Sequence, residues 1–143
     1  MAEPNSAPTP GFAPAFRMTP MRAFPVTVGE IATGGQRSYV SIGGGTFVGE
    51  GLEGRLVGGS EMHLLRADGV TVVEASYYVA FSDGSFARCF GNGYRTRAPD
   101  FEGLRLALLF EAAEDGGVAH LARLAFVAEQ AEGSPVLNIE RIV

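Results

Sequence analysis

Glu61 and His63 are the first residues whose types and spacing could do chemistry. Residues two apart in a β-strand point to the same face, so this acid and this imidazole would lie side by side. A carboxylate drawn into an apolar interior has a raised pKa, and histidine titrates near neutral pH unaided. The pair therefore predicts proton-transfer chemistry, with Glu61 or His63 as the general base.

A second group of polar and aromatic residues surrounds an Asp-Gly turn at 83–84. Tyrosine combines an apolar ring with a hydroxyl, which suits the wall of a ligand cavity, and a tyrosine or His120 could act as the acid. His120 interrupts an otherwise apolar run, VAHLARLAFVA. The candidate catalytic residues are Glu61, His63, Tyr78 and His120, and the candidate substrate-binding residues are Arg37, Glu74, Tyr77, Asn92, Tyr94 and Arg123.

Each candidate also has a plainer structural interpretation. The polar face of a half-buried strand normally faces water, and Glu74 and Tyr78 share one such face, opposite Tyr77. His120 could be a core histidine that is hydrogen-bonded to a backbone carbonyl. The arginines could form structural ion pairs as readily as they could bind an anionic ligand.

Composition narrows the class of protein. A chain of 143 residues with 46% hydrophobic residues predicts one packed domain. The net charge is −5 and all eleven basic residues are arginine, so nucleic-acid binding, Schiff-base chemistry and lysine-dependent phosphate loops are not expected. One cysteine, Cys89, and two histidines cannot form a histidine-only metal triad, and a metal site would need Glu61 or Glu74 to complete it. We therefore expect chemistry without a metal or cofactor.

The N-terminal segment differs from the rest of the chain. Residues 1–15 are rich in proline and alanine and predict a disordered tail, with the folded domain at 16–143. The segment lacks the basic start and apolar run of a secretory signal, which predicts a cytoplasmic protein. No apolar run approaches the ~20 residues needed to cross a bilayer, so no membrane insertion is expected.

Short apolar or alternating runs, separated by glycine pairs and Asp-Gly steps, predict an antiparallel meander. The glycines at 43–45 and 58–59 are interpreted as turns, and Asp83-Gly84 is the sharpest hairpin signal. The run 102–115 could be a helix by composition, but its alternating leucines favour a strand. Strands are expected near 24–28, 36–42, 46–48, 52–57, 61–66, 70–81, 85–94, 104–112, 118–129 and 136–142.

Ten short strands leave sheet edges that must be protected. Closing the sheet on itself removes those edges, so the predicted fold is an all-β, single-domain, mainly antiparallel barrel, closed or nearly closed. A two-sheet sandwich is the alternative. A barrel too wide to be filled by its side chains would leave a lumen for a ligand.

The glycine spacing is similar to that of a known family. The segment GQRSYVSIGGGTFVGEGLEGRLVGGSEMHLLRADG (35–69), with the Asp83-Gly84 turn and the closing strand, resembles the small barrel proteins grouped as domain of unknown function 3237. The resemblance spans about 16–143, and it implies an antiparallel barrel with a small-molecule cavity and no bound cofactor. The chain departs from the usual family pattern at Glu61-Met62, where relatives carry Asp-Trp.

Three functions are compatible with these residues. The first is a cofactor-independent enzyme of lyase, isomerase or hydratase type, which acts on a small, largely apolar and aromatic molecule. The second is a non-catalytic binding barrel, a carrier or sensor, in which the same polar groups orient the ligand. The third is a structural or interaction protein, which would have a filled interior and an apolar outer patch. A homodimer through a free β-edge or the barrel flank is compatible with all three.

Overall fold

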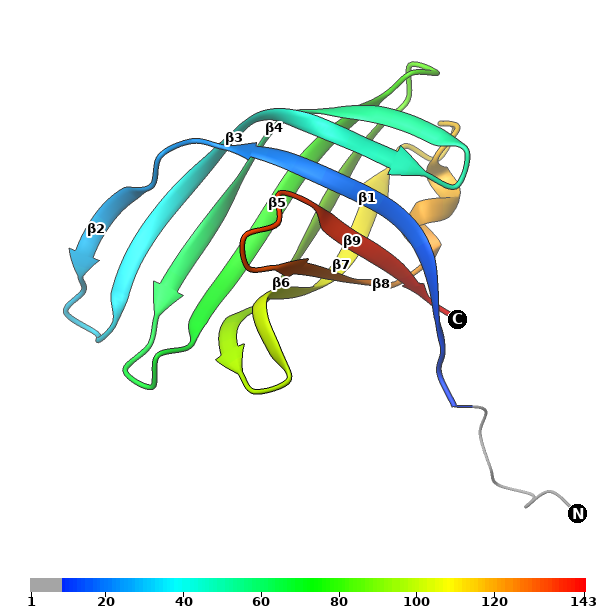
Figure 1. The fold of residues 1–143 in the computed structure, drawn as a ribbon. Helices are drawn as coiled ribbons and strands as arrows, with labels where there is room; N and C mark the ends of the chain where they lie inside the picture. Colours follow the sequence, from blue (N-terminus) through cyan, green and yellow to red (C-terminus); the bar gives the residue numbers. More distant parts are fainter. Residues whose placement is uncertain (1–8) are drawn as a thin grey trace, which may run out of the picture.

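The chain folds as a closed antiparallel β-barrel, as the sequence predicts (Figure 1). The computed structural model describes residues 9–143. A short 3₁₀ helix, η1 (Ala119–Arg123), joins β7 to β8. The strands are β1 (Phe12–Arg22), β2 (Val26–Glu30), β3 (Gln36–Gly49), β4 (Leu52–Leu65), β5 (Thr71–Phe81), β6 (Phe86–Ala98), β7 (Phe101–Ala112), β8 (Phe126–Ala131) and β9 (Leu137–Ile142).

Strand β1 closes the barrel. It pairs with β9 on one side and with β3 on the other, so eight strands form a continuous wall. The remaining strand, β2, pairs with β3 beyond the point where β1 leaves it. The end of the barrel at β2 and the β4–β5 turn is called the mouth, and η1 lies toward the opposite end (Figure 1).

Alternation along each strand separates an apolar inner face from an outer face. On β5, Val73, Ala75, Tyr77, Val79 and Phe81 are buried, and the residues between them are more exposed. Inside the barrel, aromatic rings pack near the end opposite the mouth, which we call the closed end. The ring centroid of Phe16 lies 4.6 Å from that of Phe47, and the centroid of Phe110 lies 5.0 Å from that of Phe126. Buried side chains fill this interior, so the wide lumen that the sequence suggested is not formed there.

Two predictions of local structure are confirmed. The run 102–115 contributes most of β7, and its alternating Leu104, Leu106, Leu108 and Phe110 all face the core. Asp83-Gly84 lies in the β5–β6 hairpin, where the Phe81 amide donates to the carbonyl of Ser85. No helix within residues 9–143 is long and apolar enough to span a membrane.

Strand β1 is not predicted from the sequence, which assigns its residues 12–15 to the disordered tail. Residues 1–8 of that predicted tail lie outside the described residues. Proline cannot donate a ladder hydrogen bond, so FAPAFRMTPMR does not resemble a central strand. The strand tolerates its prolines through an irregularity: the pairing with β9 shifts register between Pro14 and Phe16. The register with β3 shifts again between Met21 and Arg22, where β1 ends.

Three further expectations about local structure are wrong. The glycines at 43–45 and 58–59 lie inside β3 and β4 rather than in turns. The predicted strand at 118–129 is instead η1 followed by β8. Gly45 and Gly59 permit close approaches of neighbouring backbone in the wall. Leu121 of η1 and Val118 just before it are buried against the core, which accounts for the apolar residues in the run 118–129.

Gly59 gives a test of this close packing. Its φ is +142°, and a Cβ added there would lie 2.4 Å from the carbonyl oxygen of Ser76, so Gly59→Ala should destabilise the fold by about 1–3 kcal/mol. Gly58→Ala is the matched control, because nothing lies within 4 Å of its added Cβ. Urea unfolding measures both, and equal stability of the two variants would contradict this packing.

Candidate functional site

A buried carboxylate is the centre of the candidate site. Glu61 lies on the inner face of β4 with 0% of its surface exposed. Its strand neighbours on that face are Val40 and Ala75, which are small enough to leave room for polar partners from elsewhere in the barrel. A buried charge of this kind requires hydrogen-bond donors on all sides.

Three side chains from three strands supply those donors. Arg22, at the end of β1, donates from Nε to both Glu61 oxygens at 3.0 Å, and its Nη2 lies 2.9 Å from Oε2. The Tyr77 hydroxyl on β5 donates to Oε2 at 2.5 Å. His63 Nε2 lies 3.0 Å from Oε1. We call these four residues the Glu61 cluster.

The electrostatics of Glu61 are the reverse of the sequence expectation. Burial by itself would raise the pKa of this carboxyl, but the hydrogen bonds from His63, Arg22 and Tyr77 outweigh burial and lower the pKa to about 2. Glu61 is therefore ionised at neutral pH. It cannot serve as an acid there, and its strong hydrogen bonds make it a poor base.

The charge on Glu61 fixes the protonation of its partners. Burial and the nearby carboxylate raise the pKa of Tyr77 well above its ordinary value, so its hydroxyl keeps the proton that it donates. An ionised carboxylate can only accept hydrogen bonds, so His63 Nε2 carries the hydrogen of their contact. In a neutral imidazole, Nδ1 is then the basic nitrogen.

His63 connects the cluster to solvent at the mouth. Its side chain is 16% exposed, whereas Glu61 is fully enclosed. It lines a small pocket of about 200 Å³ with residues from β2 to β5. The lining residues are Thr27, Gln36, Arg37, Ser38, His63, Leu65 and Thr71, none of which is acidic.

Three of the predicted site residues, Glu61, His63 and Tyr77, meet in this cluster. Four others, Glu74, Asn92, Tyr94 and Tyr78, lie on the outer face of the wall, where Glu74 pairs with Asn92 and Val72 pairs with Tyr94.

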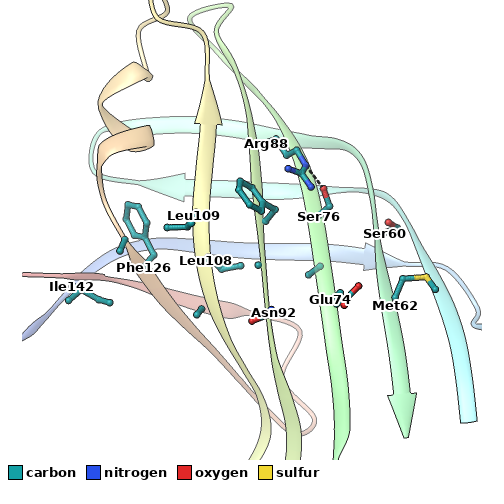
Figure 2. Close-up of a pocket in the computed structure, with 15 residues that line it drawn as sticks. Ser60, Met62, Glu74, Ser76, Arg88, Asn92, Leu108, Leu109, Phe126 and Ile142 are labelled. Carbon is teal, nitrogen blue, oxygen red and sulfur yellow. Dashed lines mark hydrogen bonds between the residues drawn. The ribbon is translucent and has the colours of Figure 1, made fainter. Parts of the chain in front are cut away.

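A groove of about 640 Å³ runs across that outer face, and Figure 2 shows Glu74 and Asn92 in it with Met62 and Leu109. A second outer groove, of about 790 Å³, contains Tyr94. Tyr78 is on the same outer face and stacks on Phe86.

The remaining candidates are also apart from the cluster. His120 is exposed on η1, toward the end of the barrel opposite the mouth, and nearby Arg123 forms an ion pair with Glu114 at 3.1 Å. Arg37 belongs to the lining of the mouth pocket, but strand alternation directs its side chain to the face opposite Ser38 and His63. Cys89 is buried, as expected, and burial raises its thiol pKa.

Arg22 is the cluster member that the sequence analysis missed. It could be identified only once β1 was recognised, since Phe16, Met18 and Pro20 precede it on the same buried face. An arginine that ends an apolar face predicts a buried acidic partner. Within the described part of the chain, no three His, Cys, Asp or Glu side chains are grouped to hold a metal ion.

The lowered pKa of Glu61 predicts how stability depends on pH. A carboxyl whose folded pKa lies below its unfolded value stabilises the fold at pH values above the unfolded pKa. This contribution is lost as the pH falls toward the folded pKa, here between 4.5 and about 2. Wild type should therefore lose about 3 kcal/mol more between pH 6 and pH 2 than Glu61→Gln, in urea unfolding at each pH.

Asp68→Asn is the control for this measurement, because Asp68 also has a lowered pKa but is exposed in its contact with Arg66. It should leave most of the acid-dependent loss in place. Parallel pH profiles for wild type and Glu61→Gln would contradict the ionised buried carboxylate.

Solved structures share this fold over nearly the whole chain. A protein with unknown function from Clostridium acetobutylicum ATCC 824 is 23% identical, with a TM-score of 0.83, covering 94% of this chain and 100% of its own. A β-barrel-like protein from Acinetobacter baumannii AYE is 18% identical, with a TM-score of 0.83 and coverages of 97% and 99%. A structure described as an enzyme from Penicillium herquei is 18% identical, with a TM-score of 0.79 and the same coverages.

No curated protein matches the sequence. The family described as "Protein of unknown function (DUF3237)" matches residues 10–103, which is more than half of the chain and includes all four members of the Glu61 cluster. The resemblance seen in the glycine spacing is thus confirmed, and the chain belongs to the DUF3237 family.

Proposed function

We propose that the protein is a cofactor-independent enzyme that transfers a proton on a small molecule bound at the mouth of the barrel. The observation that supports this most directly is the hydrogen bond between His63 and the buried, ionised Glu61, beside a pocket open to solvent. Lyase, isomerase and hydratase reactions without a cofactor can all use a proton transfer of this kind. They need only a positioned base and a group that stabilises the developing charge.

In the proposed mechanism, His63 is the catalytic base. Its Nδ1 takes a proton from a carbon next to a carbonyl group, and the electron pair of that C–H bond moves onto the carbonyl oxygen. The imidazolium so formed is stabilised by the Glu61 carboxylate. Returning the proton to another atom completes an isomerisation, and loss of a leaving group completes an elimination.

Glu61 has a positioning role in this mechanism rather than the role of base. Its hydrogen bond holds the tautomer and orientation of the His63 ring, while Arg22 and Tyr77 hold Glu61. The mouth pocket is smaller than the roughly 300 Å³ at which drug-sized sites begin. The proposed substrate is thus a small molecule with no more than a single aromatic ring.

Binding without catalysis is the second candidate function. The two outer grooves are larger than the mouth pocket, and they contain Glu74, Asn92 and Tyr94, which the sequence analysis assigned to ligand binding. An apolar ligand held there would not contact His63, so the protein would act as a carrier or sensor. For either function, we propose that the protein is cytoplasmic and that it forms a homodimer through the free edge of β2.

Deuterium exchange into the methyl group of acetophenone tests the enzymatic proposal. Wild type in D₂O should accelerate this exchange, measured by proton NMR, and His63→Gln should lower the acceleration by about 10²- to 10⁴-fold. His120→Ala is the matched control, because the other histidine of the chain lies on η1, away from the mouth.

Equal exchange by wild type and His63→Gln would exclude His63 as the base. If wild type binds acetophenone without accelerating the exchange, the carrier function is favoured. Loss of exchange in the His120 variant with retention in the His63 variant would move the site to the opposite end of the barrel.

A further inference from the structure

The hydrogen bonds of Arg22 leave part of its guanidinium unused. Nε donates to both Glu61 oxygens, and Nη2 lies 2.9 Å from Oε2. Nη2 is buried and its contact with Oε2 does not meet hydrogen-bond geometry, but at 2.9 Å it is an ion pair. Nη1 has no hydrogen-bond acceptor among residues 9–143, and the side chain is 22% exposed.

Glu61 cannot use this remaining donor. Its Oε1 already receives Arg22 Nε and His63, and its Oε2 receives Arg22 Nε and the Tyr77 hydroxyl. The carboxylate is therefore saturated and fixed. The carboxylate thus leaves the Nη1 donor of Arg22 available to an acceptor from outside the cluster.

Pairing in the sheet brings Arg22 to the same side of the wall as the mouth pocket. Arg22 pairs with Ile42 on β3, and Thr27 pairs with Ser38 four residues along the same strand. Ser38 in turn pairs with His63 on β4, two residues along the strands from the Val40–Glu61 pair. The guanidinium, the imidazole and the Ser38 hydroxyl thus lie on neighbouring positions of one inner face.

The chemistry of this face favours an acceptor ligand. The pocket lining contains hydroxyl and amide groups but no carboxylate. No described residue accepts a hydrogen bond from the Ser38 hydroxyl or forms an ion pair with Arg37. Arg22 does not itself line the pocket, but it shares Glu61 with His63, which does. Its partly exposed guanidinium is a charge-assisted donor for an oxyanion bound there.

We propose that the mouth pocket binds small molecules through an oxyanion, a carboxylate or an ionised phenol or enol oxygen, which accepts hydrogen bonds from Arg22 Nη1 and Ser38. This inference rests on the proposed function, since it names the class of substrate for that site. It also identifies the group that would stabilise the charge formed when His63 removes a proton: the enolate oxygen occupies the same position as the bound oxyanion.

Two pairs of probes test the proposal. Benzoate is compared with benzamide, and 4-nitrophenolate with 4-nitroanisole, by isothermal titration calorimetry on the full chain. Each pair keeps the ring and changes the charge on the oxygen. Wild type should bind at least one anion about 10- to 100-fold more tightly than its neutral partner, the range expected for a charge-assisted hydrogen bond.

The variants separate the pocket from the general charge of the protein. Arg22→Gln should abolish the preference for the anion. Arg17→Gln should retain it, because Arg17 is an exposed arginine on the same strand with no ion pair among the described residues. Because Arg22→Gln leaves a buried carboxylate without its main partner, the double variant Arg22→Gln/Glu61→Gln removes both charges and provides a second measurement. It too should lose the preference.

Equal affinity for both members of each pair, or a preference that survives in the double variant, would overturn the proposal. Preference for benzoate identifies carboxylates as the class, and preference for 4-nitrophenolate identifies phenols and enols. Acetophenone exchange that depends on His63 without any anion preference would leave the enzymatic function standing and reject the oxyanion site. Anion preference without exchange would support the oxyanion site and reject catalysis.

Discussion

A single buried negative charge constrains the interior of this barrel. An ionised carboxylate without exposed surface is tolerated only when donors surround it, and Glu61 obtains them from β1, β4 and β5. These strands are joined in space only when the barrel is closed, because β1 reaches the cluster through its pairing with β3. Closure of the wall and satisfaction of the charge therefore depend on each other.

The rest of the interior is arranged around this charge. Toward the closed end, aromatic rings fill the barrel, so that solvent cannot reach Glu61 from that side. Toward the mouth, His63 lines a solvent-accessible pocket and the Arg22 side chain is 22% exposed. From the closed end to the mouth, the interior therefore contains packed aromatic rings, then the buried Glu61 carboxylate, then the partly exposed His63 ring. This arrangement is suited to the transfer of one proton between His63 and a bound molecule.

Much of the fold could be predicted from local patterns. Alternating leucines identified β7, and Asp83-Gly84 identified the β5–β6 hairpin, because period-two burial and turn chemistry act over a few residues. The pairing of Glu61 with His63 followed from the same alternation. Arg22 could not be found in this way, because its partner is 39 residues away and prolines obscured its strand. The outward direction of Glu74 and Tyr78 was left open, since alternation separates two faces without saying which one is inside.

The most direct test of this account is the tautomer of His63, observed in a long-range ¹H–¹⁵N correlation spectrum at neutral pH. A fixed, ionised Glu61 predicts that the neutral form of the His63 ring carries its hydrogen on Nε2 and leaves Nδ1 bare. The exposed His120 serves as an internal reference within the same spectrum. A hydrogen on Nδ1 of His63, or the averaged pattern of a freely exchanging ring, would contradict the claim that Glu61 holds this imidazole in place.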